Sequence, residues 1–373
     1  MKPGGIEISG SGASSLAAVH EQVLNLLKAK ELQNAVTVTA HANCLRFRLR
    51  DELAADWAPG HDTTQLCRQL GLHPAGSDAD LEKEILVALL LGPVTFAFPN
   101  ARELASAIRI RRNIVKAARK TTLAFDTERA ERPQDYWTYR ENGGFTVLPG
   151  KSLITALRKA TQPDESGALY SFSCYRATEY VILLGIAQEL ADHNPALLEE
   201  LQRLSEVRAI VSGEFHDVFL REFGSMEHPL PPKYYVPGDR TWFRNPDSRS
   251  SDIKGYEGSW VFYLGEGLFT NFWKRNQPYT LTSKCLELFH WADVAAIDDA
   301  GNLRMDESKV ERLVAETMKN PVMVEAILGR MQRYREPSGI YVDGGCIDTT
   351  RECPRWVCPG TSDLIVPAMP IVA

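Results

Sequence analysis

The feature that most constrains the fold is an apolar stretch that follows Cys174 and ends at the polar residues 193–195. Its pattern predicts a helix over residues 174–192. The period of the sequence then changes, because residues 208–216, 231–246 and 259–273 all have strand patterns, and the last of them predicts a β-hairpin. A helix followed by several antiparallel strands indicates an α+β fold.

Cys174 stands at the start of this helix, directly after an aromatic approach. A free cysteine often serves as a small buried hydrophobe. At the first turn of a helix, however, unpaired N–H groups and the macrodipole favour an anion. The thiolate is the nucleophilic form of cysteine, and such surroundings lower a thiol pKa from about 8.5 into a range of roughly 3.5 to 7.5. The position therefore predicts a reactive thiol with a lowered pKa.

The remaining patterns divide the chain into four parts. Residues 1–85 predict an N-terminal α/β elaboration, 86–275 the core, 276–335 a helical extension and 336–373 an irregular, proline-rich tail. Two short strands are expected within residues 35–50. Further helices are expected over residues 14–30, 80–91, 100–121, 152–160, 195–204, 281–291, 306–318 and 322–334.

Composition excludes several classes of protein. The net charge of −6 argues against a broad nucleic-acid surface, and the basic residues between Arg109 and Lys120 are expected to form a solvated helix face. No apolar run is long enough for a membrane span, and the N-terminus lacks a signal core. The protein is therefore expected in the cytoplasm, or outside the cell by a route without a classical signal peptide.

Seven cysteines, an odd number, fit a reducing compartment better than a disulfide scaffold. The three cysteines after residue 345 are spaced without a C-x-x-C pair or a nearby histidine. This spacing does not match a zinc site. No metal and no cofactor are expected.

A nucleophilic cysteine requires a partner that takes or holds its proton. The strands after the helix offer five candidates: His216, Asp239, Glu257, Ser259 and Glu266, the last of which lies at the hairpin turn. Each also has a structural interpretation: His216 could pair with Glu214 at the surface, and Asp239 follows Pro-Gly and is a typical turn former. Glu257 precedes an aromatic strand, where a carboxylate is unusual.

Five stretches together resemble a known family. They are residues 92–121, 135–160, 168–187 (ALYSFSCYRATEYVILLGIA), 238–246 (GDRTWFRNP) and 260–267 (WVFYLGEG). They resemble, in family order, the protein-glutamine γ-glutamyltransferases of Bacillus spores, within the NlpC/P60 papain-like superfamily. The resemblance implies a papain-like core whose nucleophile helix packs on an antiparallel sheet.

The resemblance also implies a reaction. Cys174 would form a thioester with a glutamine side chain of a protein or peptide, release ammonia, and pass the acyl group to a lysine or other primary amine. The family carries a glutamate at the position of Ser173 and its partner glutamate at that of Ser259; its later histidine aligns near Asn271 or Phe272. Either Glu257 takes over the partner role, helped by a shared strand face or a bulge at Gly258, or catalysis is lost and a binding protein remains.

The candidate partners His216 and Glu257 differ in how their charges would affect the thiolate of Cys174. Lowering the Cys174 pKa to near 6.5 requires about 2.7 kcal/mol, more than a helix end typically supplies. His216 as an imidazolium would help, whereas the charge of Glu257 would oppose the thiolate. Aromatic walls around the thioester would exclude water and so favour transfer to an amine. Without such walls the thioester would hydrolyse, and the protein would be a cysteine amidase or peptidase. Candidates for such walls are Trp137, Tyr139, Phe172, Tyr175, Trp242 and Trp260.

Overall fold

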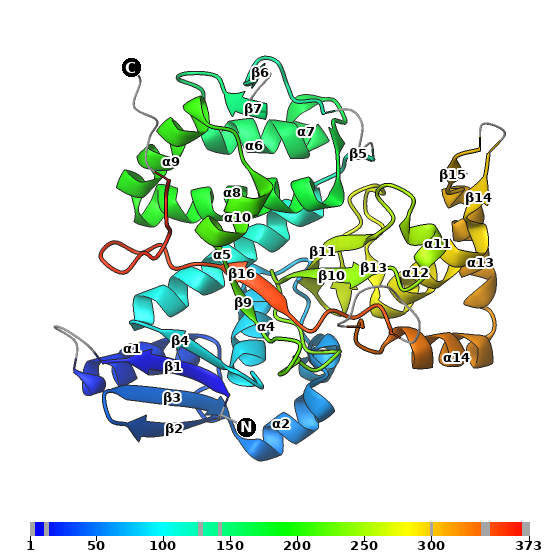
Figure 1. Cartoon of the computed structure of the whole chain (residues 1–373). Helices are drawn as coiled ribbons and strands as arrows, with labels where there is room; N and C mark the ends of the chain where they lie inside the picture. Colours follow the sequence, from blue (N-terminus) through cyan, green and yellow to red (C-terminus); the bar gives the residue numbers. More distant parts are fainter. Residues whose placement is uncertain are drawn as a thin grey trace.

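The computed structural model describes residues 4–10, 15–125, 130–140, 144–298, 301–336 and 344–367. Helices and strands are mixed throughout, as Figure 1 shows, so the α+β prediction is confirmed. Two sheets dominate, one of four strands and one of six. One long helix, α5 (Ala101–Lys120), contacts both of them (Figure 1).

The four-stranded sheet forms an N-terminal lobe at the lower left of Figure 1. Its order is β2-β3-β1-β4, in which β1 pairs with β3 antiparallel and with β4 parallel. The predicted boundary at residue 85 falls within α4 (Asp78–Leu90), and β4 lies beyond it, so this lobe takes a strand from the following segment. The lobe's elements are β1 (Gly5–Ser9), α1 (Leu16–Ala29), β2 (Val36–His41), β3 (Cys44–Leu49) and β4 (Thr95–Phe98).

Two twenty-residue helices, α5 (Ala101–Lys120) and α8 (Cys174–His193), pack against each other in the main core. Their close approach requires a glycine, because a Cβ atom on Gly185 of α8 would lie 2.6 Å from Cγ1 of Ile114. Both helices begin at a polar cap, Asn100 for α5 and Ser173 for α8. The predicted helix after Cys174 is therefore confirmed to within one residue at its end.

The six-stranded sheet has the order β13-β12-β11-β10-β16-β9. The segment predicted as an irregular tail contributes β16, which pairs antiparallel with β10 on one side and β9 on the other. The expectation of a wholly irregular tail is therefore wrong. The predicted hairpin is confirmed as β11 and β12. The strands are β9 (Leu220–Phe223), β10 (Arg240–Arg244), β11 (Gly258–Gly265), β12 (Leu268–Phe269), β13 (Tyr279–Thr280) and β16 (Arg351–Pro354).

Residues 208–216 are not the predicted strand. They end in α10 (Ser212–Phe219), a short helix that runs directly into β9. Phe215, Val218 and Phe219 are all buried, and their spacing of three and four residues is helical. A strand would have placed Phe215 and Phe219 on one face and Val218 on the other.

The basic face of α5 is not solvated as expected. Arg111 is buried, and its Nη1 atom lies 2.7 Å from the carboxylate of Asp239. Arg109 and Arg112 pair with carboxylates of neighbouring helices, Glu189 of α8 and Glu82 of α4. The basic run therefore anchors α5 within the fold.

The other predicted helices are present. They are α4 (Asp78–Leu90), α6 (Leu153–Thr161), α9 (Pro195–Val207), α12 (Leu281–Val294), α13 (Glu307–Thr317) and α14 (Pro321–Met331). The shorter helices are α2 (Asp51–Trp57), α3 (Leu66–Leu70), α7 (Pro163–Ser166) and α11 (Ser248–Ser251), together with two 3₁₀ turns over 59–61 and 63–65. Three further pairs of short strands are β5 (Ala124–Phe125) with β8 (Ser171–Phe172), β6 (Trp137–Arg140) with β7 (Gly144–Val147), and β14 (Ala296–Ile297) with β15 (Leu303–Arg304). Among the described residues, no helix combines the length and apolarity needed to cross a membrane.

Glu84 of α4 is fully buried beneath the β11–β12 turn. Its Oε1 atom accepts hydrogen bonds from the Tyr263 hydroxyl (3.1 Å) and the Glu266 amide (3.0 Å). Burial raises the pKa of this carboxyl to about 7, from an ordinary value of 4.5. The folded state therefore keeps a proton that the unfolded chain releases between these two values.

We expect the free energy of unfolding to fall by up to about 3 kcal/mol as the pH rises from 4.5 to above 7. Glu84→Gln keeps the acceptor oxygen and cannot ionise, so it should abolish this fall and exceed the wild type in stability at pH 8. Urea unfolding at pH 5 and pH 8 measures the effect, with the exposed Glu325→Gln as control. Parallel stability profiles for wild type and Glu84→Gln would contradict it.

Candidate active site

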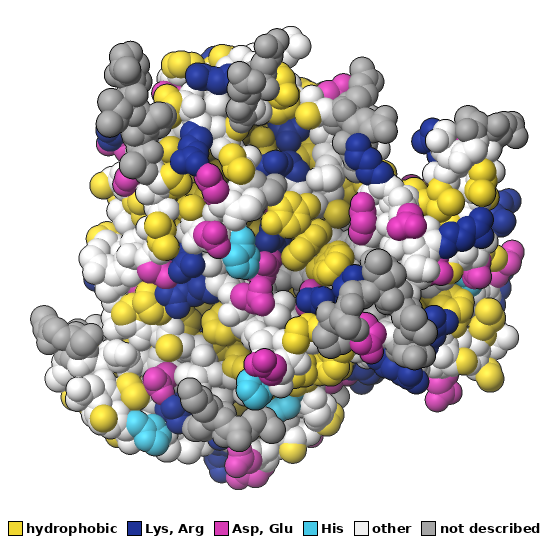
Figure 2. All heavy atoms as spheres, viewed as in Figure 1, with side chains coloured by type: hydrophobic (Ala, Val, Ile, Leu, Met, Phe, Trp, Pro, Cys, Tyr) yellow, Lys and Arg dark blue, Asp and Glu magenta, His cyan; other side chains and the backbone are white. Residues whose placement is uncertain are grey.

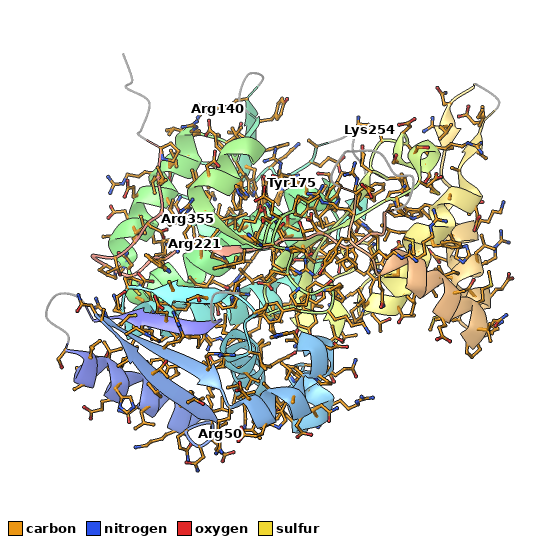
Figure 3. The ribbon with its side chains drawn as sticks, turned by 60° about the horizontal axis from the view of Figure 1, so that its bottom comes forward. Arg50, Arg140, Tyr175, Arg221, Lys254 and Arg355 are labelled. Atoms are coloured by element: carbon orange, nitrogen blue, oxygen red, sulfur yellow. The ribbon has the colours of Figure 1, made fainter. Side chains whose placement is uncertain are left out.

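Cys174 is the first residue of α8 and is partly exposed. The hydroxyl of Ser173 caps the helix by accepting a hydrogen bond from the Arg176 amide (3.3 Å). Ahead of it, the short strand β8 pairs with β5, so that Phe172 lies beside Phe125. Tyr175, the residue that follows Cys174, is labelled near the middle of the molecule in Figure 3. The nucleophile candidate therefore sits at a capped helix start in the body of the fold.

Two backbone amides, those of Trp260 and Tyr175, lie close enough to the sulfur of Cys174 to stabilise its thiolate. Trp260 lies in the first half of β11. Because β12 pairs with β11 only from Tyr263 onward, this half has no partner strand on the β12 side. Both amides lower the thiol pKa, but burial of the sulfur outweighs them, and the net pKa is raised. The expectation of a lowered pKa is therefore wrong, because desolvation penalises the thiolate more than the helix start favours it.

Two ionisable side chains act on Cys174 with opposite signs. Lys284, a buried residue of α12, lowers the pKa of the thiol, and Glu257 raises it. The structure thus brings Glu257, one of the predicted partners, close enough to Cys174 for a direct electrostatic effect. Lys284 was missed in the sequence, where it is a single cation within a largely apolar helical pattern.

Glu257 is exposed and directly precedes β11, and its Oε2 atom accepts a hydrogen bond from the Gly255 amide (3.0 Å). The bulge considered at Gly258 is absent, since the β10–β11 register runs unbroken to the Gly258–Arg244 pair. The glycine at position 258 instead makes room for the ring of Trp242, because a Cβ atom there would lie 2.2 Å from its Nε1 atom. Glu257 is therefore placed by the loop before the strand.

Ser259 is buried on β11. Because side chains alternate along a strand, it shares a face with Val261 and Tyr263, which belong to the core beneath α12. Trp260 and Phe262 occupy the opposite face, toward α8. Ser259 thus lies on the face away from the ring of Trp260.

Tyr175, Trp242 and Trp260 form an aromatic cluster beside Cys174. Ring centroids lie 5.3 Å apart for Tyr175 and Trp260, and 5.9 Å for Trp242 and Trp260. The guanidinium of Arg240, which is buried, faces two of these rings at 5.0 Å (Tyr175) and 4.6 Å (Trp260). Figure 2 shows hydrophobic side chains gathered on this face of the molecule between α10 and β11, with acidic side chains close by.

The other predicted aromatic walls lie elsewhere. Trp137 and Phe172 are buried and both contact Tyr180 of α8, so they belong to the main core. Tyr139 is exposed and packs on Phe145 across the β6–β7 pair.

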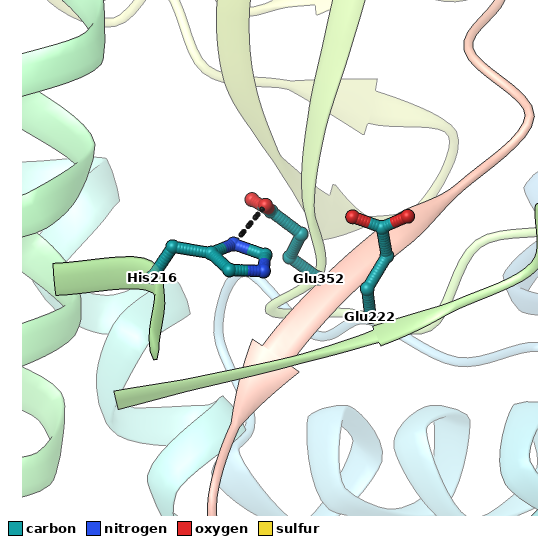
Figure 4. Close-up of side chains that lie close together, drawn as sticks. All are labelled: His216, Glu222 and Glu352. Atoms are coloured by element: carbon teal, nitrogen blue, oxygen red, sulfur yellow. Dashed lines mark hydrogen bonds and ion pairs between the residues drawn. The ribbon is translucent and has the colours of Figure 1, made fainter. Parts of the chain in front are cut away.

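His216 is part of a separate cluster, drawn in Figure 4. Its Nδ1 atom lies 2.8 Å from Oε1 of Glu352, which raises the pKa of the imidazole, and Glu222 lies nearby. The other oxygen of Glu352 bonds to Arg240. The structure therefore pairs His216 with Glu352 of β16 and not with Cys174. The ligand atoms of His216, Glu222 and Glu352 all lie within 4.8 Å of one another, so these are the described residues that could hold a metal ion.

Asp239 has a structural role. It is buried, pairs with Arg111 of α5, and its Oδ2 atom accepts a hydrogen bond from the Val236 amide (2.7 Å) that closes the Pro-Gly-Asp turn. Its interpretation as a turn former is thus the one that its contacts support.

All seven cysteines are free thiols. The three C-terminal ones, Cys346, Cys353 and Cys358, are buried. Of the two partly exposed cysteines, Cys44 and Cys174, only Cys174 has the nearby amides described above.

Because Glu257 and Lys284 carry opposite charges, neutralising each of them should shift the pKa of the Cys174 thiol in opposite directions. Glu257→Gln should lower the thiol pKa and move the midpoint of alkylation to lower pH, whereas Lys284→Met should raise it. The measurement is the rate of iodoacetamide labelling against pH, followed by mass spectrometry of the peptide that contains Cys174. Glu199→Gln, an exposed carboxylate on α9, is the matched control and should leave the midpoint unchanged. Shifts of the same sign in both variants would refute this electrostatic arrangement.

Comparisons with known proteins point to one family. The family profile of protein-glutamine gamma-glutamyltransferase matches residues 64–363. A protein-glutamine gamma-glutamyltransferase of Bacillus pumilus (strain SAFR-032) is 26% identical over 186 residues, covering 49% of this chain and 69% of that relative. A transglutaminase structure from Geobacillus stearothermophilus, without its C-terminal extension, aligns with a TM-score of 0.37 and 18% identity over 58% of this chain and 98% of that one. Because the profile covers most of the sequence, the chain belongs to the protein-glutamine γ-glutamyltransferase family.

Proposed function

We propose that this transglutaminase uses Cys174 as its nucleophile and Glu257 as the proton acceptor, on a papain-like core of the NlpC/P60 type. The observation that carries the proposal is the position of Cys174, the partly exposed first residue of α8, which lies beside the ring pair of Tyr175 and Trp260 and within the electrostatic reach of Glu257. The packing of α8 against the antiparallel strand β11 supports the papain-like assignment.

The first half-reaction consumes a glutamine of a protein or peptide. The sulfur of Cys174 attacks the side-chain carboxamide carbon, the C–N bond breaks, and the thiol hydrogen leaves with the nitrogen as ammonia. The products are a γ-glutamyl thioester and ammonia. No metal or cofactor takes part in this balance.

The raised thiol pKa makes a proton acceptor necessary. At neutral pH the resting sulfur carries its proton, and a carboxylate that also disfavours a neighbouring thiolate suits the role of a general base. Glu257 would take the proton as the sulfur attacks and return it to the leaving nitrogen. The amides of Trp260 and Tyr175, which lie beside Cys174, would then stabilise the oxyanion of the tetrahedral intermediate.

The second half-reaction transfers the acyl group. A primary amine attacks the thioester carbon, the C–S bond breaks, and the proton that the amine gives up restores the thiol. Water competes for the same carbon and would yield glutamate. The rings of Tyr175, Trp242 and Trp260 beside Cys174 limit its access and favour the isopeptide product.

The test is incubation of a glutamine-containing protein with a labelled primary amine. We expect incorporation together with ammonia release, loss of both in Cys174→Ala, and a reduction of roughly 10²- to 10⁴-fold in Glu257→Gln. Glu199→Gln should match the wild type. Ammonia release without incorporation would show a hydrolase, and full activity of Cys174→Ala would overturn the proposal.

His216→Ala separates the two candidate partners. Because the imidazole is bonded to Glu352, we expect a loss smaller than tenfold in kcat/KM for the glutamine donor. A loss equal to that of Cys174→Ala would instead assign the partner role to His216. Glu257→Gln should lower kcat while it leaves the KM for the glutamine donor nearly unchanged, a split that a merely structural role would not explain.

A further inference from the structure

We propose that the cavity between β13 and the helices α12 and α13 is the subsite for the amine acceptor, a lysine side chain of the second protein; this rests on the function proposed above. The cavity has a volume of about 340 Å³, within the size range of small-ligand sites. Its walls combine three aromatic rings with three carboxylates: Trp273, Tyr279, Trp291, Glu287, Glu307 and Glu311.

Rings and carboxylates are the groups that bind an alkylammonium in proteins. The structure contains an example of its own at the inner wall. The ammonium of Lys284 lies 4.2 Å from the Tyr279 ring centroid and 5.8 Å from that of Trp291, and 2.7 Å from Oε2 of Glu287. The same chemistry would receive the methylene chain and ammonium of an incoming lysine.

The charges are graded from the mouth of the cavity inward. Three glutamates and Lys274 give the lining a formal net charge of −2. Glu307 and Glu311 are exposed, and Glu307 accepts a hydrogen bond from the Tyr256 hydroxyl (2.8 Å) while Glu311 pairs with Lys274. Lys284 is buried on the inner side. A cation is therefore attracted at the mouth and meets an opposing charge deeper inside.

Ring contacts and one strand pairing lead from this cavity toward the segment that holds Cys174. Phe125 lies 4.9 Å from Trp273, a wall of the cavity, and pairs in the β5–β8 ladder with Phe172, two residues before Cys174. Tyr256, next to the proposed base, lies 5.1 Å from Trp291. In addition, the charge of Lys284 reaches the Cys174 thiol directly. The walls of the cavity are thus linked to residues that lie close to Cys174 and Glu257 in the sequence.

This arrangement, with carboxylates at the mouth and the buried Lys284 inside, suits the transfer of the acyl group to an amine. A lysine arrives as an ammonium but attacks only as the free amine. Apolar walls and the nearby charge of Lys284 favour loss of that proton close to Cys174, and Glu257 is placed to accept it. The nitrogen then bonds to the acyl carbon as the C–S bond breaks, and the sulfur regains its hydrogen.

The experiment compares two acceptors at a saturating glutamine donor. Dansylcadaverine is cationic at neutral pH, whereas hydroxylamine is small and uncharged. In Glu307→Gln/Glu311→Gln we expect the KM for dansylcadaverine to rise roughly three- to tenfold. The KM for hydroxylamine should change less than twofold. Glu325→Gln, an exposed carboxylate on α14 outside the cavity, is the control and should change neither.

The outcomes distinguish the two proposals. An unchanged KM for dansylcadaverine in the double variant, or an equal rise for both acceptors, would overturn the acceptor subsite while leaving the chemistry of Cys174 intact. Absence of ammonia release in the wild type would instead overturn the proposed function. A second double variant, Glu307→Lys/Glu311→Lys, should raise the KM for dansylcadaverine further, and circular dichroism of each variant verifies its folding.

Discussion

The guanidinium of Arg240 is the group on which the active-site region depends. It is buried, so its charge must be compensated within the protein. Glu352 of β16 supplies that charge, Thr178 of α8 accepts a further hydrogen bond at 3.3 Å, and the rings of Tyr175 and Trp260 cover the guanidinium. One side chain of β10 thereby fixes the helix start, the strand and the C-terminal segment relative to one another. The two amides beside Cys174 belong to residues held in this way.

The site differs from a preformed cysteine–histidine ion pair. Burial keeps the thiol protonated, and the histidine that could have held a thiolate is engaged by Glu352. Activation would then take place during attack, when Glu257 accepts the proton, and not in the resting enzyme. Such a thiol is protected from unselective alkylation and oxidation until a substrate arrives, because the thiolate is the reactive form. The departures from the family pattern at Ser173 and Ser259 are compatible with a carboxylate supplied from the preceding loop.

Long periodic segments could be predicted from the sequence, whereas features that depend on distant partners could not. The helix that starts at Cys174 and the β11–β12 hairpin have strong local patterns. β16 has only four residues and becomes a strand through β9 and β10, which lie more than a hundred positions earlier. For the same reason, the burial of Arg111 against Asp239 and the approach of Lys284 to Cys174 left no local signal. Cys174 and Glu257 were predicted from their positions, but the sign of the thiol pKa shift depended on how deeply the sulfur is covered.

The insertion of β16 between β10 and β9 also bears on the order in which this region can assemble during folding. Residues 351–354 must leave the ribosome before the six-stranded sheet closes and Arg240 receives its counter-charge. Until then α8 and β11 lack the compensation that fixes their spacing. A chain in which residues 351–354 have not yet joined the sheet therefore lacks the counter-charge of Arg240, and the start of α8 and β11 are not held together by it.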